Sequence, residues 1–168
     1  MTEIVLPKID RSILNNKSEI IRKLARFTNP ENVLSEADEL RPYETDALSV
    51  YTQTPLAVVL PENTQEVSEI LKYCNEQNIK VVPRGAGTGL SGGALPLQDA
   101  ILLGLGKFNK ILEIDYENKC VITQPGVTNL GITHAVEHKG FYYAPDPSSQ
   151  LACSIGGNVA ENSGGVHS

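Results

Sequence analysis

Apolar residues recur at helical spacing in two stretches of the first half of the chain. Residues 17–27 place apolar side chains on one face at Ile20, Ile21, Leu24 and Phe27. A second set follows Asn63 and comprises Val67, Ile70, Leu71 and Cys74. Both spacings predict amphipathic helices. Asn63 and Glu66 stand three residues apart as in a capping box, so we expect the second helix to begin directly after Asn63.

Short apolar runs and alternating stretches predict strands. The runs at 56–60, 80–82 and 100–103 are too short for helices and indicate buried strands. Residues 111–115 and 120–124 alternate around a turn and predict a hairpin. Another helix is expected from Thr128 to Gly140, followed by a strand at Tyr142-Tyr143. Residues 28–55 contain three prolines and are expected to form a long surface connection. The order of elements indicates an α+β fold.

Composition and charge exclude several classes of partner. The 168 residues carry a net charge of −6, which argues against nucleic acid or an anionic membrane surface. No stretch approaches the ~20 apolar residues of a transmembrane helix, and the first residues lack the pattern of a signal peptide. Cys74, Cys120 and Cys153 are odd in number and widely spaced, which predicts reduced thiols in a cytoplasmic protein.

The segment VVPRGAGTGLSGG, residues 81–93, is dense in glycine, with five glycines among thirteen residues. Glycine lets a ligand approach the backbone closely, and consecutive inward amides form a concave site for phosphate oxygens. Thr88 and Ser91 add hydroxyl donors, and Arg84 is expected to direct its planar fork at phosphate. A second tract of small residues, 144–165, is expected to form the opposite wall around a pyrophosphate.

Other interpretations of these motifs are weaker. Gly87, Gly89 and Gly92 match the dinucleotide fingerprint GxGxxG, but a strand follows instead of the helix that the fingerprint must open. No lysine follows the loop, so it is no P-loop. His134 and His138 belong to an HxxEH pattern that lacks a third zinc ligand, and we expect no metal. A purely structural turn would not need five glycines. Asp146 could orient a ligand hydroxyl or cap the following serines.

Several motifs together resemble one family of flavoproteins. They are VVPRGAGTGLSGG, KFNKILEID, TQPGV, YAPDPSSQ and IGGNVAENSGG, with RPYETDALS upstream. In this order they resemble the FAD-binding domain of the vanillyl-alcohol oxidase-type (PCMH-type) flavoproteins. Within that group they are most similar to the D subunit of bacterial glycolate oxidases and to FAD-linked D-lactate dehydrogenases. The resemblance covers almost everything between residues 15 and 166.

The resemblance implies a division of the chain and a set of cofactor-binding residues. Residues 1–50 would form an N-terminal helix and connecting segment, and residues 51–168 a partial FAD-binding domain. This comprises the first subdomain and the start of the second, truncated before the substrate-binding cap. The implied residues that bind FAD are Arg84, Gly85, Ala86, Gly87, Thr88, Gly89, Leu90, Ser91, Gly92, Pro145, Asp146, Ser148, Ser149, Gly156, Gly157, Asn158, Ala160, Gly164 and Gly165.

The resemblance also implies an activity. Its members oxidise a small 2-hydroxy acid, glycolate or D-lactate here, to the 2-oxo acid with hydride transfer to flavin N5. No catalytic acid or base can be named within these residues, so the chain alone is expected to be inactive. The alternative is a non-catalytic flavin-binding or scaffold fragment of a multi-subunit oxidase. We expect non-covalent FAD, further oxidase subunits including an iron–sulfur subunit, and a cytoplasmic location or peripheral attachment to the inner membrane through those subunits.

Overall fold

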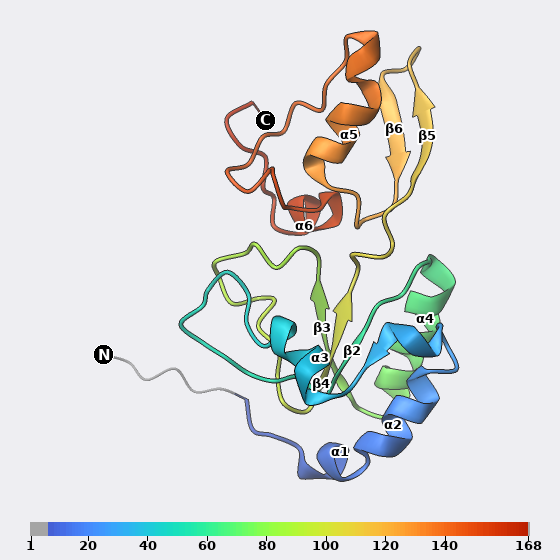
Figure 1. Ribbon diagram of the computed structural model, residues 1–168, viewed down its shortest axis with the longest axis vertical. Coiled ribbons are helices and arrows are strands. Elements are labelled where there is room, and N and C mark those ends of the chain that lie inside the picture. Colours follow the sequence, from blue (N-terminus) through green and yellow to red (C-terminus); the bar gives the residue numbers. More distant parts are fainter. Residues whose placement is uncertain (1–6, 168) are drawn as a thin grey trace.

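Residues 7–167, which the computed structural model describes, form two lobes joined by the segment between β4 and β5 (Figure 1). The first lobe contains α1 (Arg11–Asn15), α2 (Lys17–Leu24), η1 (Pro30–Asn32), β1 (Val33–Leu34), α3 (Ala37–Leu40), η2 (Arg41–Tyr43), β2 (Ala57–Val59), α4 (Thr64–Glu76), β3 (Lys80–Arg84) and β4 (Ala100–Gly104). The second lobe contains β5 (Ile111–Asp115), β6 (Cys120–Thr123), α5 (Asn129–Val136), η3 (Glu137–Lys139) and α6 (Ile155–Ala160).

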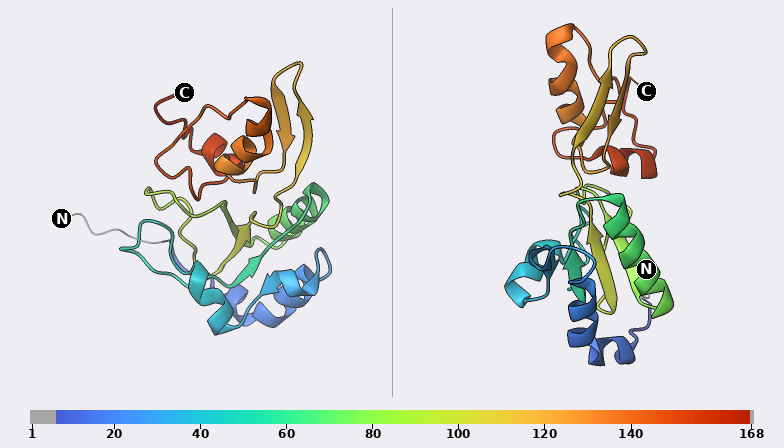
Figure 2. Two further views of the ribbon diagram at one scale, coloured as in Figure 1. Left: turned by 45° about the horizontal axis from the view of Figure 1, so that its top comes forward. Right: turned by 90° about the vertical axis from the view of Figure 1, so that its right-hand side faces the viewer.

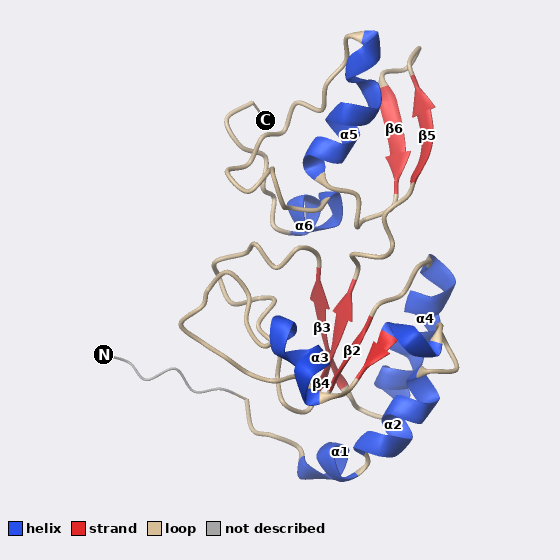
Figure 3. Ribbon diagram, in the orientation of Figure 1, coloured by secondary structure: helices blue, strands red, loops and turns tan. Residues whose placement is uncertain are grey.

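A four-stranded sheet organises the first lobe, with strand order β1-β2-β4-β3 (Figure 3). β4 runs parallel to both of its neighbours, and Leu102 lies opposite Val58 on one side and Val82 on the other. All residues of β2 and β4 are buried. Such continuous burial is typical of parallel strands that are covered on both faces.

Helices cover the two faces of this sheet, as the side view in Figure 2 shows. α2 and α4 pack on one face, where Leu24 and Ile70 join Ile101 in the larger core. Leu40 of α3 packs on the other face against Val58 and Leu102. Because β2, β4 and β3 run parallel, their carboxyl ends lie at the same end of the sheet. The glycine-rich loop follows β3 at that end.

The helix that was expected after Asn63 is present as α4. The Asn63 side chain accepts a hydrogen bond from the backbone N–H of Glu66 at 3.0 Å. In a capping box the Glu66 carboxylate would accept a hydrogen bond from the N–H of the capping residue Asn63. Here it accepts from the N–H of the preceding residue, Glu62. Ile70 and Cys74 are buried, whereas Leu71 is 44% exposed, so its assignment to the buried face was wrong.

Two expectations for irregular and regular segments need correction. Residues 28–55 form more than a surface connection, since they contain β1, which pairs antiparallel with β2 at the edge of the sheet. Tyr142-Tyr143 forms no strand, because the N–H of Tyr143 donates to the hydroxyl of Thr133 on α5 and not to a neighbouring strand.

The N-terminal helices share the core of the first lobe with β2 and β4. The division at residue 50 stays a prediction.

The second lobe is a hairpin covered by a helix. β5 and β6 pair antiparallel, as expected, with a register irregularity between Ile111 and Glu113. Thr128 caps α5 by accepting from the N–H of Gly131 at 3.1 Å. Gly140 ends the helical segment with a φ of 77°, a left-handed conformation that glycine adopts without strain.

A buried carboxylate fastens the N-terminal segment to the sheet. Asp99 accepts from the N–H of Asp10 and from the ammonium of Lys80, both at 2.6 Å. Burial raises the pKa of Asp99, but these hydrogen bonds outweigh it and hold the pKa below its ordinary 3.8. The stabilisation is therefore present above pH 3.8 and is lost as the pH falls through the lower, folded-state pKa.

We expect Asp99→Ala to lower the free energy of unfolding by about 2 kcal/mol at neutral pH, the scale of hydrogen bonds to a charged group. Urea denaturation from about pH 3 to pH 7 measures this, and the difference from the wild-type protein should shrink toward acid. Glu117→Ala, an exposed change in the β5–β6 turn, serves as control. A difference that is constant over this pH range would contradict the assignment.

Candidate functional site

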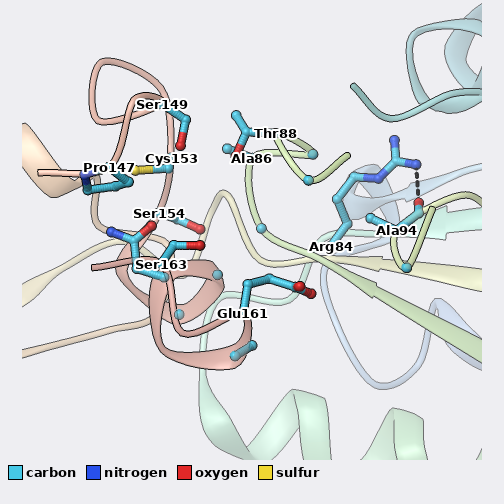
Figure 4. A pocket seen from close by; sticks show the side chains of 18 of the residues that line it. Arg84, Ala86, Thr88, Ala94, Pro147, Ser149, Cys153, Ser154, Glu161 and Ser163 are labelled. Atoms are coloured by element: carbon cyan, nitrogen blue, oxygen red, sulfur yellow. Dashed lines mark hydrogen bonds between the residues drawn. The ribbon is translucent and has the colours of Figure 1, made fainter. Parts of the chain in front are cut away.

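A cavity of about 480 Å³ lies between the two lobes. The glycine-rich loop after β3 forms one wall, and the segment from residue 147 through α6 forms the other (Figure 4). Leu105 and Pro125 add to the lining. The volume falls within the range of small-molecule sites, which are commonly formed where two units of structure meet. The two small-residue tracts therefore face each other as the sequence predicted.

Arg84 ends β3 and is 6% exposed. Its guanidinium donates to the carbonyl of Tyr43 at 3.1 Å and to the carbonyl of Ala94. Burial lowers the pKa of Arg84, while the nearby carboxylate of Asp46 opposes this shift. In Figure 4 the side chain leads away from the opposite wall toward Ala94. The expectation that this fork faces phosphate is corrected for its two terminal nitrogens, which bind the carbonyls of Tyr43 and Ala94. The third nitrogen, Nε, has no hydrogen-bond partner among residues 7–167.

The segment around residues 41–51 supports the glycine-rich loop from outside. The N–H of Ala47 donates to the carbonyl of Gly87 at 2.9 Å, and the side chain of Leu48 lies 3.5 Å from the position of a Cβ on Gly92. Gly87 and Gly92 have φ values of 71° and 76°, which favour glycine strongly. Part of the glycine requirement is therefore conformational.

Glycines also allow close contact between and within the lobes. A Cβ on Gly85 would collide with the hydroxyl of Ser154 in the other lobe, and a Cβ on Gly156 would lie 2.6 Å from the Cβ of Pro125 within the second lobe. Gly89 differs, because a Cβ added there would have no heavy atom of the described residues within 4 Å. Gly89 lines the cavity, so the space beside it is available to a ligand.

Three buried polar atoms of residues on the cavity wall lack a hydrogen-bond partner among residues 7–167, namely Arg84 Nε, Ser154 Oγ and Asn158 Nδ2. Ser154 and Asn158 are 5% and 6% exposed. Buried polar atoms are nearly always paired, so these atoms indicate a ligand. An amide N–H and a hydroxyl suit the oxygens of a pyrophosphate or the carbonyls of a flavin ring, and the site therefore fits FAD.

Most of the predicted site residues line this cavity. Those on its wall are Arg84, Gly85, Ala86, Gly87, Thr88, Gly89, Leu90, Ser91, Ser148, Ser149, Gly156, Gly157, Asn158 and Ala160. The predicted residues that lie outside the lining are Gly92, Pro145, Asp146, Gly164 and Gly165. Lining residues that were not predicted are Pro83, Gly93, Ala94, Leu105, Pro125, Pro147, Cys153, Ser154, Glu161 and Ser163.

Asp146 binds His167 and does not cap the following serines, while its expected contact with a ligand hydroxyl stays a prediction. Its carboxylate accepts from the backbone N–H of His167 at 3.0 Å and lies 2.7 Å from the His167 ring nitrogen Nδ1. These hydrogen bonds hold the pKa of Asp146 below its ordinary value. Asp146 therefore closes the turn at residues 164–167.

Ser154 and Glu161 line the cavity but were not predicted to do so. Both lie within the second tract, and their polar side chains among small residues are the feature of the sequence that could have indicated them.

The histidine pattern of α5 and η3 is not assembled into a metal site. His138 packs its ring edge-on against Tyr116, with 6.4 Å between the ring centroids. Residues 7–167 contain no group of three or more histidine, cysteine, aspartate or glutamate side chains that could hold a metal ion. Within the same residues no helix is long and apolar enough to cross a membrane.

Comparisons with known proteins also indicate a site for FAD. The family model described as FAD binding domain matches residues 55–168. The chain is 49% identical to glycolate oxidase subunit GlcD of Escherichia coli, over 96% of this chain and 31% of that protein. It is 43% identical to GlcD of Bacillus subtilis, over 88% and 32%. It is 36% identical to mitochondrial D-2-hydroxyglutarate dehydrogenase of Arabidopsis thaliana, over 81% and 24%.

Solved structures confirm the fold. Alkyldihydroxyacetonephosphate synthase matches 94% of this chain with a TM-score of 0.77 at 19% identity, over 30% of its own length. p-Cresol methylhydroxylase with substrate bound matches 93% with a TM-score of 0.74 at 25% identity, over 31% of its own length. The chain thus spans about a third of the curated relatives named above, or less. The chain belongs to the FAD binding domain family of the PCMH-type flavoproteins, and its cofactor is FAD.

Proposed function

We propose that this chain is the FAD-binding part of a flavin-dependent oxidoreductase that acts on a small 2-hydroxy acid, such as glycolate or D-lactate. The cavity between the lobes carries the proposal, because its wall combines a glycine-rich loop with buried polar atoms that have no hydrogen-bond partner among residues 7–167. The substrate class is supported by the likeness to glycolate oxidase subunits and D-2-hydroxyglutarate dehydrogenases. When bound, FAD would supply the acceptor for the hydride that leaves the substrate.

The chain's own residues would bind and orient the cofactor. The backbone amides of residues 85–91 and the hydroxyls of Thr88, Ser91, Ser148 and Ser149 are donors for the pyrophosphate. Ser154 and Asn158 would supply hydrogen bonds from the opposite wall. Gly156, Gly157 and Ala160 allow close approach there because their side chains are small or absent. Five residues that the resemblance also implied lie outside the lining and would support these walls, namely Gly92, Pro145, Asp146, Gly164 and Gly165.

The second candidate is a flavin-binding or scaffold piece of a multi-subunit oxidase that has no activity of its own. The observation behind it is the extent of the match, since the chain spans about a third of GlcD and the matched family model is an FAD binding domain. Further oxidase subunits, an iron–sulfur subunit among them, would then complete the enzyme in the cytoplasm or at the inner membrane.

A titration of the purified chain with FAD, followed by flavin fluorescence, tests the proposal. We expect saturable binding of FAD in preference to FMN, because the cavity wall offers donors for a pyrophosphate that FMN lacks. A folded chain that binds neither flavin would contradict the proposed function. Turnover of glycolate or D-lactate by the loaded chain would separate the two candidates.

The same complex tests how the flavin is held. We expect acid precipitation of the protein to release the flavin into the supernatant, because the histidines stand away from the cavity lining. His167 is paired with Asp146, His138 contacts Tyr116, and His134 lies on α5. Flavin that stays with the precipitate would show a covalent linkage and contradict the expectation.

A further inference from the structure

Glu161 places a carboxylate in the cavity between the lobes. Its backbone is fixed at the end of α6, where its N–H donates to the carbonyl of Gly157 at 3.0 Å. Its side chain projects from α6 toward the glycine-rich loop (Figure 4), with Oε1 3.9 Å from the position of a Cβ on Gly93. Within residues 7–167 no side-chain hydrogen bond or ion pair engages this carboxylate. The carboxylate is therefore available to a ligand.

Glu161 is exposed to solvent in the free protein, and the fold of residues 7–167 gives its carboxylate no partner of its own. A carboxylate at the C-terminal end of a helix faces the negative end of the helix dipole, which is unfavourable. Arg84 is the other charged residue on the cavity wall, all of which the structure describes. Its guanidinium is bound to the carbonyls of Tyr43 and Ala94. No cation in the lining therefore compensates Glu161.

The other polar groups of the cavity are mainly donors. Loop amides, the serine and threonine hydroxyls and the unpartnered amide nitrogen of Asn158 all suit phosphate oxygens. An ionised carboxylate only accepts hydrogen bonds, and it repels a phosphate at short range. The donors of a flavin dinucleotide are the adenine amine, the flavin ring N3–H and the hydroxyls of the ribose and the ribityl chain. Among these, vicinal hydroxyls present two O–H donors side by side, which suits the two oxygens of one carboxylate. Carboxylates accept from ribose hydroxyls in other dinucleotide sites and disfavour a phosphate there.

We propose that Glu161 is a specificity-determining residue whose carboxylate accepts hydrogen bonds from vicinal hydroxyls of the bound dinucleotide. The inference rests on the proposed function, since it needs FAD in this cavity. Two parts of FAD carry such hydroxyls, the adenosine ribose and the ribityl chain. The unpartnered polar groups of Ser154 and Asn158 on the same wall are the independent sign that a ligand belongs there.

Affinities of Glu161→Ala and Glu161→Gln for FAD and for inorganic pyrophosphate test this role. Loss of a charged acceptor should weaken FAD binding about tenfold in Glu161→Ala, and less in Glu161→Gln. Pyrophosphate has no hydroxyl groups of this kind, so its affinity should stay the same or rise when the repulsion is removed. Glu137→Ala removes an exposed acid of η3 in the same lobe and should change neither affinity.

The outcomes separate this inference from the proposed function. Wild-type binding of FAD together with unchanged or tighter FAD binding by Glu161→Ala would overturn the inference alone. A folded wild-type chain that does not bind FAD would overturn both. Equal weakening of FAD and pyrophosphate would also overturn the inference, because it would indicate a distorted site. Titrations with ADP and FMN locate the hydroxyls, since the variant should weaken ADP binding if the ribose is contacted and FMN binding if the ribityl chain is.

Discussion

Replacing Gly89 with valine is expected to lower the affinity of the chain for FAD about 100-fold while its thermal stability stays near that of the wild type. Gly89 lines the cavity, and an added Cβ would meet no heavy atom of residues 7–167 within 4 Å. The valine side chain can therefore be accommodated in the free protein. In the complex it would occupy the space that the ligand needs, and overpacking of this kind costs about 1–3 kcal/mol, or roughly 5- to 150-fold in affinity.

Gly106→Val is the matched control. Gly106 likewise has open space at its Cβ position among the described residues, but it does not line the cavity. The Gly106→Val variant should therefore fold and bind FAD as the wild-type protein does. Calorimetric titration with FAD and circular dichroism on both variants measure affinity and fold together. Affinity of Gly89→Val within about twofold of the wild type, below the roughly fivefold effect of one lost kcal/mol, would show that the ligand does not approach this residue.

The glycines that the sequence alone would select for this test are less suitable. Gly87 and Gly92 have φ values of 71° and 76°, and valine at such angles strains the backbone whether or not a ligand binds. Gly85 has no room for a Cβ beside Ser154. Loss of binding in these variants would therefore report on the loop conformation and on the contact between the lobes. The sequence shows how many glycines the loop has but not which of these roles each one serves.

Local patterns predicted the elements that depend on local interactions. α4 follows its cap at Asn63, and β2 and β4 follow from apolar runs that are too short for helices. β1 is only two residues long and exists because β2 offers a free edge, which no local pattern could show. α6 contains Gly156 and Gly157, residues that disfavour helix, so tertiary contacts such as that with Pro125 determine it.

The candidate site was predicted well as a pair of tracts and less well residue by residue. Composition indicated that small residues would surround a ligand, and the cavity does lie between the two tracts. The direction of each side chain depends on contacts that are distant in sequence. Asp146 turns toward His167, and Leu105 and Pro125 reach the wall only because the lobes are arranged as they are. The largest difference of this kind concerns Arg84.

Replacing Arg84 with leucine is expected to lower the free energy of unfolding by about 3 kcal/mol. The variant loses two hydrogen bonds from a charged, buried donor and leaves the carbonyls of Tyr43 and Ala94 without it. Hydrogen bonds to charged groups contribute about 1.5–3 kcal/mol each. Urea denaturation measures the loss. Arg41→Leu removes an exposed arginine from the same supporting segment and should change the stability by less than about 0.5 kcal/mol.

The salt dependence of FAD binding distinguishes a structural role of Arg84 from a direct contact with phosphate. A guanidinium that pairs with the pyrophosphate would make binding weaken with ionic strength, because salt screens such charges. Backbone amides and hydroxyls carry no net charge, and the carboxylate of Glu161 repels phosphate, so the wall that the structure shows should give no steep loss of binding with salt. Arg84→Leu should therefore weaken FAD binding through a loosened loop without changing the slope against salt. The opposite result has two parts. FAD binding by the wild-type protein would depend steeply on salt, and Arg84→Leu would abolish that dependence without changing the stability of the protein. This result would place the guanidinium on the phosphate.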